Sequence, residues 1–491
     1  MIVEALLWVS LLVLLYLSLR KPPGLPPGRW GLPLVGYIPL TTRSLSQQLA
    51  DLRNKHGDIY IWRIGTHLHV FLHDHQLVKE AFNRPEFKDR ADLKAFRFMD
   101  PDIRGLVNSN EDLWHNNRRF TLRQLRDLGM GKSMLVSVVQ SQASLLVEEL
   151  KKQTGRPAPI PNAITLAIIN VIWHMVTGKQ FTLKDPKIRQ FSKILDETLR
   201  KINLLMVPDY LPWLRSLLPN TVLRWIFGID EVSDMREVLY KFFIDDIKEH
   251  QRTLDPNNPR DLMDGYLIEM EERKDDPHST FSEEDLTVLA FDLFVAGSET
   301  TTNTMIWIIY FLTNNPQVQS KMQAEIDQVL PPGTQATLQD RARLPYTEAV
   351  IHETLRKSTL VPLGVPHVAS QNTTLGGYVI PKGTMVTCST LTVHNSDRYW
   401  DQPDHFQPER WLDHNNKFTT KKEGFVPFSI GKRQCAGESL ARMELFIFTT
   451  TLFQTLNFSV PPGKTLSLEV NSGNAFFRLP IQQDLLVTLR K

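Results

Sequence analysis

Cysteine is nearly absent from this sequence, since its 491 residues include only Cys388 and Cys435. Two cysteines cannot build a disulfide framework, so we expect most of the chain to face a reducing compartment. Cys388 lies in a strand-like run and is expected to be an inert core residue. An excess of charge of one sign is also missing. The 56 basic and 54 acidic residues leave a formal charge of +2, which argues against a nucleic-acid partner held by phosphate neutralisation.

Long polar linkers, low-complexity tracts and internal repeats are not found after residue 30. With 42% hydrophobic and 22% charged side chains, the composition is that of a globular protein with a large core. We therefore expect one large domain rather than several of ordinary size. A complete phosphate-binding loop is missing too. Gly131-Lys132-Ser133 resembles the end of one, but Arg126 occupies the position of its first glycine.

The N-terminus carries an uncharged apolar run at residues 5–19, which Arg20 and Lys21 follow at once. A run of about this length just spans a ~30 Å hydrocarbon core. The alternative is a cleaved secretory signal, but the early Glu4 does not fit the basic start of one. We expect residues 1–20 to be a single-pass membrane anchor, and the positive charges after it to place the rest of the chain in the cytosol.

Prolines and glycines are frequent in residues 21–36, which predicts a stiff, non-helical spacer ahead of a catalytic domain at 37–491. Most of that domain has helical periodicity. An alternating run at 59–72 predicts a β-hairpin, and strand-like pieces return at 365–390 and 458–490. The expected fold class is mainly α with small β-sheets (α+β).

The clearest expected helix begins at Ser282 and ends at Pro316. Ser282 and Asp285 match a capping box, and a helix of roughly 32 residues, ~48 Å long, would cross the whole domain. Small and polar residues from Ala296 to Thr301 interrupt its apolar sequence. Such residues let a flat molecule approach the backbone, although threonine hydroxyls often only bond to the carbonyl four residues back.

The stretch from Phe428 to Gly437 holds Cys435 directly before another expected helix. A thiolate must stay ionised to bind iron, and a helix N-terminus favours the anion. Gly431 and Gly437 let the backbone lie close to a flat cofactor, while Arg433 can pair with a carboxylate at its rim. Phe428 is expected to pack near the sulfur and limit water. Cys435 is therefore the candidate metal ligand.

These residues resemble the haem-binding signature FxxGxRxCxG of cytochromes P450, and the resemblance extends over nearly the whole chain. It implies the cytochrome P450 fold and haem b (iron protoporphyrin IX) with Cys435 as the axial thiolate. Glu353-Thr-Leu-Arg356 matches the family's ExxR, and Arg410 lies in its PERF-like motif. The resemblance implies that these side chains form a buried ion network that fixes the cysteine loop, whereas a bare ExxR is common as a surface pair.

The resemblance also assigns residues around the haem. Trp114 and Arg118 match WxxxR, whose members bond the propionates, and they share a helix face. His367 is either another propionate donor or a satisfied core histidine. The expected cofactor-binding residues are Trp114, Arg118, Ala296, His367, Phe428, Arg433, Cys435 and Gly437.

The family's AGxET motif matches Ala296 to Thr300 and implies that Thr300 and Glu299 deliver protons during O2 cleavage, which the thiolate promotes electronically. Most positions that correspond to substrate contacts are apolar, which predicts a lipophilic substrate. Asn108 stands where the family often has an aromatic residue, which puts the upper pocket wall in doubt. The expected substrate contacts are Val107, Ala296, Thr300, Val361, Val365 and Phe476.

The anchor, the spacer, PFSIGKRQCAGESLAR and GVPH together resemble the second family of animal microsomal cytochromes P450 and imply the endoplasmic reticulum membrane. The leading hypothesis is a monooxygenase that inserts one atom of O2 into a steroid, fatty acid, terpenoid or xenobiotic. No GxGxxG follows a strand, so NADPH must act through a separate cytochrome P450 reductase, with cytochrome b5 as a further candidate partner. The resemblance places reductase docking on a basic stripe of Arg119, Arg123 and Arg126.

Two alternatives stay open. One is a haem-thiolate isomerase or dehydratase of peroxides, which needs neither O2 nor reductase, and the Glu299-Thr300 pair disfavours it. The other is a non-catalytic haem sensor or electron carrier, for which we expect a second strong axial ligand opposite Cys435. The long helix offers Ala296, Gly297 and Thr300 there instead.

Overall fold

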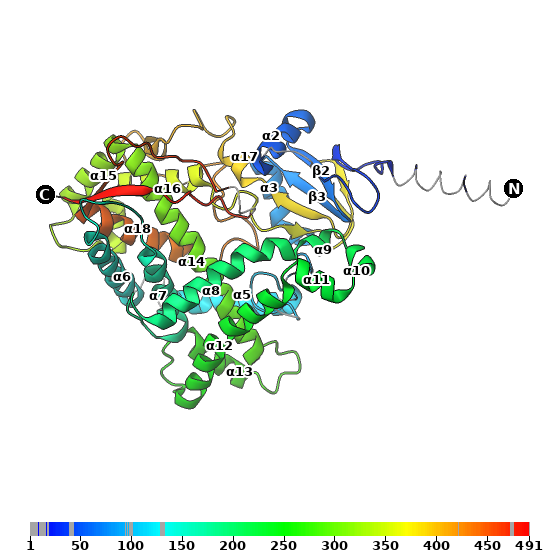
Figure 1. Cartoon of the computed structure of the whole chain (residues 1–491), viewed down its shortest axis with the longest axis horizontal. Helices are drawn as coiled ribbons and strands as arrows, with labels where there is room; N and C mark the ends of the chain where they lie inside the picture. The colour runs from blue at the N-terminus through cyan, green and yellow to red at the C-terminus, as the bar shows by residue number, and fades with distance from the viewer. Residues whose placement is uncertain are drawn as a thin grey trace.

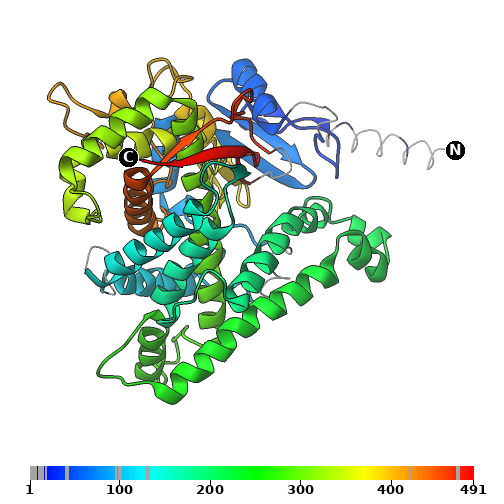
Figure 2. The same cartoon turned by 60° about the vertical axis from the view of Figure 1, so that its left-hand side comes forward.

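A strand-rich part at one side and a larger helical part make up the computed structural model (Figures 1 and 2). The strand-rich part combines N-terminal strands with strands from residues 367–388. The C-terminus lies at the other side of the molecule. The residues that the structure describes are 8, 16, 19–38, 44–93, 95, 97, 102–127, 133–420, 422–471 and 476–490.

Helices account for most of the described chain, as the sequence predicted. Three short 3-10 turns are η1 (Pro85–Phe87), η2 (Leu338–Arg343) and η3 (Pro408–Trp411). The α-helices are α2 (Leu45–His56), α3 (His75–Asn83), α5 (Glu111–Asp127), α6 (Ser133–Lys151), α7 (Ala163–Thr177), α8 (Pro186–Leu205), α9 (Val207–Tyr210), α10 (Leu214–Leu217), α11 (Asn220–Ile226), α12 (Ile229–Thr253), α13 (Leu262–Glu272), α14 (Glu283–Asn314), α15 (Pro316–Val329), α16 (Pro345–Ser358), α17 (Thr390–His394) and α18 (Glu438–Thr455).

The strands form three small sheets. The largest has the order β1-β2-β3-β8-β5, and its central hairpin pairs Ile59 with Leu72, as predicted for residues 59–72. Cys388 on β8 is buried, and burial raises the pKa of its thiol to about 12, so it is the inert core residue that we expected. The strands are β1 (Gly28–Arg29), β2 (Ile59–Ile64), β3 (His67–Leu72), β4 (Pro157–Pro159), β5 (His367–Val368), β6 (Thr373–Leu375), β7 (Tyr378–Ile380), β8 (Met385–Cys388), β9 (Leu456–Ser459) and β10 (Asp484–Leu489).

The long helix α14 is the centre of the helical core. It has 32 residues, and Pro316 begins the next helix, as predicted. The Ser282 side chain accepts a hydrogen bond from the backbone N–H of Asp285, which is one half of a capping box. The Asp285 carboxylate instead bonds to the backbone of Gly105 in a distant loop. Four helices pack against α14, namely α7, α12, α16 and α18. The small and polar residues within α14 therefore lie in the protein interior.

The proline-rich segment expected as a spacer at residues 21–36 lies against the catalytic body. Gly28 and Arg29 extend the largest sheet as β1, and Leu25 is buried in the cluster beneath it. The Gly24 carbonyl accepts a hydrogen bond from Val379. Residue 36 is therefore not a visible boundary in the structure.

The expected membrane anchor at residues 1–20 lies largely outside the described residues. Among the helices that are described, none combines the length and the apolar character that crossing a membrane requires.

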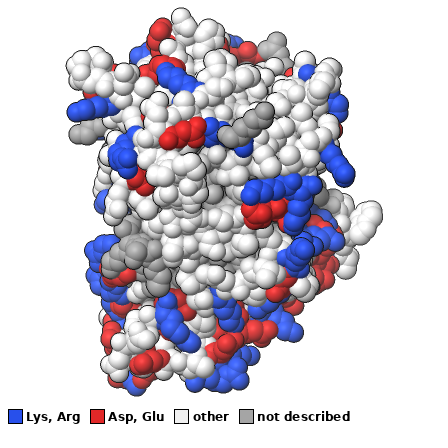
Figure 3. Space-filling model, turned by 90° about the vertical axis from the view of Figure 1, so that its left-hand side faces the viewer, with Lys and Arg blue, Asp and Glu red and all other residues white. Residues whose placement is uncertain are grey.

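Positive and negative side chains are mixed on the face shown in Figure 3, with most of them in its lower part. This face therefore has no broad field of one sign, in agreement with the net charge of +2.

The even spacing of the four histidines from His67 to His75 predicts a solvated strand face, and this prediction is wrong for His69 and His73. His69 and His73 are buried, and burial lowers the pKa of each to about 3. His69 stacks on Tyr210, and His73 stacks on Tyr60 with a centroid separation of 4.8 Å. These imidazoles therefore serve as neutral aromatic packing groups.

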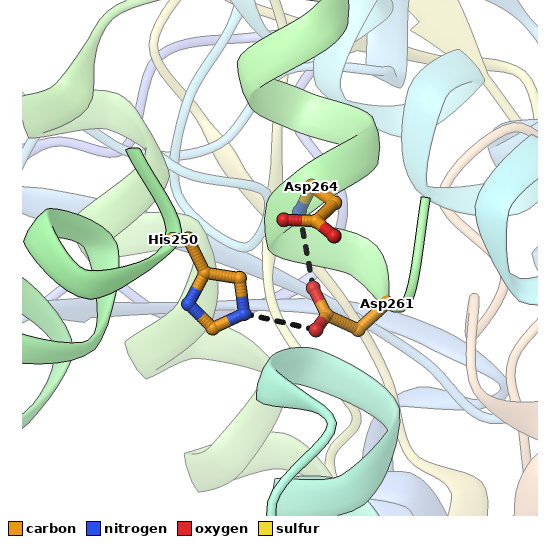
Figure 4. Close-up of side chains that lie close together, drawn as sticks. All are labelled: His250, Asp261 and Asp264. Atoms are coloured by element: carbon orange, nitrogen blue, oxygen red, sulfur yellow. Dashed lines mark hydrogen bonds and ion pairs between the residues drawn. The ribbon is translucent and has the colours of Figure 1, made fainter. Parts of the chain in front are cut away.

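A buried charged cluster joins the end of α12 to the start of α13 (Figure 4). His250 Nδ1 lies 2.7 Å from the Asp246 carbonyl, and its Nε2 lies 2.9 Å from an Asp261 carboxylate oxygen. Both partners are acceptors, so both ring nitrogens carry a proton and His250 is a cation. Burial lowers the pKa of His250, but the hydrogen bond to Asp261 and the nearby carboxylates outweigh it and raise the pKa above 6.5.

The same cluster has the composition of a metal site, because ligand atoms of His250, Asp261 and Asp264 lie within 4.8 Å of one another. These ligand atoms already take part in hydrogen bonds within the protein. Asp264 accepts two side-chain hydrogen bonds from Arg260, and Asp261 caps α13 through the backbone N–H of Asp264. The cluster is therefore a structural joint between the two helices.

We expect His250→Gln to destabilise the protein by about 3 to 5 kcal/mol, because it leaves Asp261 buried without its cation. A raised pKa in the folded state means that this stability is present below about pH 6.5 and is lost as pH rises through the folded pKa. Urea unfolding at several pH values measures both effects. His278→Gln, at an exposed histidine, is the control, and equal curves for the two variants would contradict the assignment.

Candidate active site

Cys435 ends a loop that leads directly into α18. Its backbone N–H donates to the Phe428 carbonyl at 2.9 Å, and the Phe428 ring lies 4.9 Å from the Arg442 guanidinium carbon. Burial raises the pKa of the thiol, while the backbone N–H of Gly437 lowers it. The residue nevertheless remains exposed, so its sulfur borders an accessible space. Coordination by a cation would replace the lost hydration and hold the sulfur as a thiolate.

Gly431 allows this loop to approach the end of α3. Its φ is +81°, and a Cβ atom there would lie 2.0 Å from the Phe82 carbonyl oxygen. No residue with a side chain fits that position. At Gly437, by contrast, an added Cβ would make an ordinary contact of 3.9 Å with the Cys435 sulfur.

Three guanidinium groups gather beside the cysteine loop, from Arg90, Arg118 and Arg433. Burial, and then the charge of Arg118, lower the pKa of Arg90 to about 9. Burial, and then Arg90, also lower the pKa of Arg433 to about 9, although Asp89 opposes the decrease. The Arg433 guanidinium carbon lies 4.0 Å from the Trp114 ring centre. This part of the site carries an excess of buried positive charge.

The hydrogen bonds of this arginine cluster go to neutral acceptors. Arg118 donates to the Gln434 carbonyl at 2.8 Å, and Arg433 donates to the Lys88 and Ser109 carbonyls. Within the described residues, Arg433 Nη1 and Arg90 Nε are buried without any partner. Unpaired buried donors are costly, so the cluster is arranged to receive an anion with several acceptor oxygens.

The donor set fits an iron porphyrin. Cys435 supplies a soft anionic ligand, and the arginine cluster can neutralise two propionates at one edge of a flat ring. Arg90 was missed in the sequence, because no motif surrounds it and only the fold brings it to Arg433. Asn110 was missed as well, and its side-chain oxygen accepts hydrogen bonds from the backbone N–H of Arg90 and from Arg433.

His367 is buried and stacked on Phe82 with a centroid separation of 3.8 Å. Its Nδ1 lies 2.6 Å from the Phe87 carbonyl, so this nitrogen carries the proton of the neutral ring. Burial, and then Arg90, lower the pKa of His367 well below 6.5. In the neutral ring Nε2 is unprotonated, and a propionate anion beside it would favour a second proton there.

The small and polar residues from Ala296 to Thr301, here called the polar break, interrupt the apolar sequence of α14 but not the helix itself. They include Glu299 and Thr300. The Thr300 hydroxyl donates to the Ala296 carbonyl at 2.7 Å, which is the local bond that a helical threonine commonly makes. Its oxygen can still accept a hydrogen bond. Burial raises the pKa of Glu299, and Asp196 on α8 adds to this, while Asn303 donates to its carboxylate at 3.1 Å. Ala296 is exposed although α14 lies inside the protein, so the break borders an accessible space.

Two carboxylates on α14 hold the loop that carries Val107. An Asp292 oxygen accepts from the backbone N–H groups of Leu106 and Val107 at 2.7 and 2.8 Å, and Asp285 accepts from Gly105 at 2.9 Å. We did not identify Asp292 from the sequence. A carboxylate within the apolar run before Ala296 was the signal that could have revealed it, because such a charge needs buried donors.

The other expected substrate contacts are partly accessible. Val365 is 44% exposed, and its carbonyl accepts a hydrogen bond from Arg90 at 2.9 Å, which links this segment to the arginine cluster. Val361 lies on the same connection between α16 and β5 and is partly buried, whereas Phe476 packs at the edge of the main core. Accessible apolar side chains near the cluster are suited to an apolar ligand.

Glu353 and Arg356 on α16 form an ion pair in which neither side chain has any exposed surface. Two parallel hydrogen bonds of 2.7 and 2.9 Å join them. Arg410 and the indole N–H of Trp411 complete the acceptor capacity of Glu353 at 3.1 and 3.0 Å. Arg356 also donates to the carbonyls of His394, Pro403 and His405.

A series of hydrogen bonds connects this network to the cysteine loop. His394, whose carbonyl binds Arg356, accepts the backbone N–H of Val426 at its Nε2. The Val426 carbonyl in turn accepts from Ser429, within the loop that carries Phe428 and ends at Cys435. The ion pair therefore acts on the cysteine through backbone geometry.

We expect Arg356→Ala to cost about 3 to 5 kcal/mol in the free energy of unfolding, because Glu353 would stay buried with one cation fewer. Urea unfolding measures this cost. Lys151→Ala removes an exposed pair of the same spacing, Lys151 with Glu148, and should cost about 1 kcal/mol or less. Similar losses in the free energy of unfolding for both variants would show that the Arg356 network stabilises the protein no more than an exposed ion pair does.

The basic stripe expected on α5 is only partly available. Arg123 is paired with Glu269 of α13, which Arg273 also contacts. Arg126 pairs with its neighbour Asp127 at 3.1 Å, and Arg119 is exposed. Tertiary contacts have thus neutralised part of a surface that looked continuous in the sequence.

Comparisons with known proteins agree with this geometry. A family model described as "Cytochrome P450" matches residues 26–487. The chain is 44% identical to "Cytochrome P450 2L1" of Panulirus argus, with all of both chains covered. It is 37% identical to "Cytochrome P450 2C28" of Mesocricetus auratus over 91% of each chain. It is also 36% identical to "Cytochrome P450 2J2" of Homo sapiens, over 93% of this chain and 90% of that one.

Proposed function

This chain belongs to the cytochrome P450 family, whose members are monooxygenases with a haem held by a cysteine thiolate, and we propose that it oxygenates a lipophilic small molecule with electrons from NADPH. The observation that carries the proposal is the combination of Cys435 before the start of α18 with a buried arginine cluster in which Arg433 Nη1 and Arg90 Nε have no partner among the described residues. The candidate substrates are a steroid, a fatty acid, a terpenoid or a xenobiotic.

Haem b would be held by Cys435 at the iron and by Arg118, Arg433 and Arg90 at the propionates. Trp114 supports Arg433 from one face. Gly437 and Phe428 would lie beside the sulfur, and His367, which stacks on Phe82 and bonds to the Phe87 carbonyl, is the further candidate donor to a propionate. When bound, the haem supplies O2 activation, and the thiolate provides the electron push for it.

Protons would reach the reacting oxygen through α14. The Thr300 hydroxyl donates to Ala296, so its oxygen is free to accept a proton donor from the ligand side. Glu299 keeps its proton to a higher pH than an ordinary carboxyl group, because burial raises its pKa. The two groups can thus orient and supply protons for the reaction.

Replacing Thr300 by Ala tests this role, because the change removes a hydroxyl but little volume. If Thr300 orders the proton supply, reducing equivalents should be diverted into hydrogen peroxide. We expect product formed per NADPH consumed to fall about tenfold or more, with haem content and substrate affinity retained. Thr304→Ala removes a hydroxyl that bonds to the Thr300 carbonyl and is a matched control. An unchanged ratio would count against proton delivery by Thr300.

Two other haem-thiolate activities differ from monooxygenation in ways that can be tested. A peroxide isomerase or dehydratase would turn over with peroxide alone, without O2 and reductase. A non-catalytic haem sensor or electron carrier needs a strong second axial ligand. The described stretch of α14 around its break offers Ala296, Gly297 and Thr300, none of which is such a ligand.

The proposed location is the endoplasmic reticulum membrane, with residues 1–20 as anchor and the domain of residues 37–491 in the cytosol. The sequence resembles animal microsomal cytochromes P450, and exposed apolar side chains support the proposal. Trp213, directly before α10, donates to the Leu34 carbonyl at 3.2 Å and joins α10 to the N-terminal segment. Leu217 on α10 is 70% and Trp225 on α11 is 82% exposed, and Leu32 and Leu34 exceed half. Exposed apolar side chains of this kind are suited to lipid.

We expect Trp225 to enter the lipid when the full chain binds vesicles. Brominated lipids should quench its fluorescence, and Trp225→Phe should reduce the quenched fraction by about one tryptophan's share, since aromatic side chains favour the membrane interface. Trp400→Phe, at a buried tryptophan of the catalytic body, is the control and should leave the quenched intensity, the loss of fluorescence on quenching, unchanged. Equal quenching of the wild type and the Trp225→Phe variant would show that this surface does not meet the membrane.

Electrons would come from NADPH–cytochrome P450 reductase, with cytochrome b5 as a second candidate partner. Such a partner could bind exposed cations of two segments. These are Arg119 and Arg126 on α5 and Lys432 of the cysteine loop. They lie on the two segments that hold Arg118 and Cys435, so a partner bound there would approach the haem from the thiolate side.

A further inference from the structure

A cavity of about 470 Å³ lies between the C-terminal end of α14 and the chain that precedes η3. This volume is sufficient for a small molecule. Several residues on the rim of the cavity are exposed, so it opens to solvent. It is separate from the haem site, because Asn314 on its rim lies about 21 Å along α14 from Thr300.

One wall of this cavity is flat and apolar. Phe311 and Phe406 both line it, and their rings stack with centroids 4.8 Å apart and planes 4° apart. Leu468 adds a further apolar side chain. Aromatic rings favour offset-stacked or edge-to-face contacts, so a flat apolar molecule can lie against this wall.

A cation, Lys357 near the C-terminal end of α16, also lines the cavity. Its ammonium group has three donors, but within the described residues it makes a single hydrogen bond, to the Pro403 carbonyl at 3.2 Å. Burial, and then Arg356, lower the pKa of Lys357 to about 8. Asp404 and Glu353 oppose the decrease, but neither forms an ion pair with Lys357. An anion in the cavity would supply the acceptors that this ammonium group lacks.

Two exposed side chains on the rim determine which anion is suitable. The Asn314 amide and the Asp404 carboxylate line the cavity, and neither makes a side-chain hydrogen bond within the described part of the chain. The amide can donate to a carboxylate. Asp404 repels an anion, and it repels a dianion such as phosphate more strongly than a monoanion. The rim therefore favours a single negative charge.

We propose that this cavity is a binding site for a small aromatic monocarboxylate, whose carboxylate bonds to Lys357 and whose ring lies against Phe311 and Phe406. The ammonium group gains a charge-assisted hydrogen bond, which is stronger than its bond to a neutral carbonyl. The apolar wall is removed from water at the same time. Binding at this site does not depend on the reaction at the haem.

A ligand at this site also stabilises the chain segment that Arg356 holds. The carbonyls of Pro403 and His405 accept hydrogen bonds from Arg356 at 2.9 and 3.0 Å. The Pro403 carbonyl also accepts from Lys357, and His405 lines the cavity. A molecule that binds only the folded protein stabilises the contacts it depends on, so we expect it to slow the local opening of residues 402–407.

The experiment uses the full-chain haem protein, with benzoate as the probe and benzamide as its uncharged counterpart. Titration calorimetry measures the affinity, and we expect benzoate to bind about tenfold or more tightly than benzamide. Hydrogen exchange locates the site. Benzoate should slow exchange of the backbone N–H groups in residues 402–407, whereas a probe in the haem pocket would slow exchange around Thr300 instead.

Three substitutions change the charge of the cavity. Lys357→Met removes the cation at similar volume and should weaken benzoate binding about tenfold or more. Asn314→Asp adds an exposed carboxylate and should weaken binding about twofold to fivefold, whereas Asp404→Asn removes one and should strengthen it by a similar factor. Lys274→Met, at an exposed lysine paired with Glu271, is the control and should bind benzoate as the wild type does.

Three results would overturn the proposal. The first is equal affinity of the wild type and Lys357→Met for benzoate, and the second is the absence of saturable binding to the wild type. The third is slowed exchange confined to the residues around Thr300. If Lys357→Met does not fold, the two exposed substitutions decide the question, because affinities of Asn314→Asp and Asp404→Asn that do not change in opposite directions would exclude an anion at this site.

Discussion

A guanidinium group with no exposed surface must find acceptors for its N–H groups inside the protein, and the rest of this site depends on how Arg356 does so. Glu353 takes two of its hydrogen bonds, and the carbonyls of His394 at the end of α17, Pro403 and His405 take the others. Arg356 therefore fixes the path of the chain between α17 and η3. Hydrogen bonds through His394 and Val426 connect this path to the loop that ends at Cys435.

The arginine cluster beside Cys435 differs from Arg356 in its hydrogen-bond acceptors. Arg356 lies against a carboxylate, whereas Arg90, Arg118 and Arg433 lie mainly against carbonyls and one another. Burial lowers the pKa of all three, although Asp89 opposes the decrease at Arg433 and Cys435 opposes it at Arg118. A protein gains no stability from such a cluster by itself. Its value lies in a bound anion, and this contrast separates a structural ion pair from a ligand site where a sequence shows only arginines.

The sequence revealed those parts of the site that depend on local spacing. The glycine, arginine and cysteine of the final loop, the ExxR pair and the long helix α14 are defined by residues within a few turns of one another, and their positions agree with the structure. It did not reveal Arg90, Asn110 or Asp292, whose partners are distant in the chain. The burial of His69 and His73 was missed for the same reason, since only the fold brings β8 and α9 over that hairpin.

The break in α14 is constrained from several sides, and this sets what Thr300 can do. A Cβ at Gly297 would lie 2.7 Å from an Ile172 methyl group, so α7 packs directly on the backbone there. Asp292 accepts hydrogen bonds from the backbone of Leu106 and Val107, in the loop that packs beside the break. The Thr300 hydroxyl donates its single proton to the Ala296 carbonyl. A ligand that approaches Thr300 therefore meets an acceptor oxygen whose position depends on the packing of α7 and of this loop.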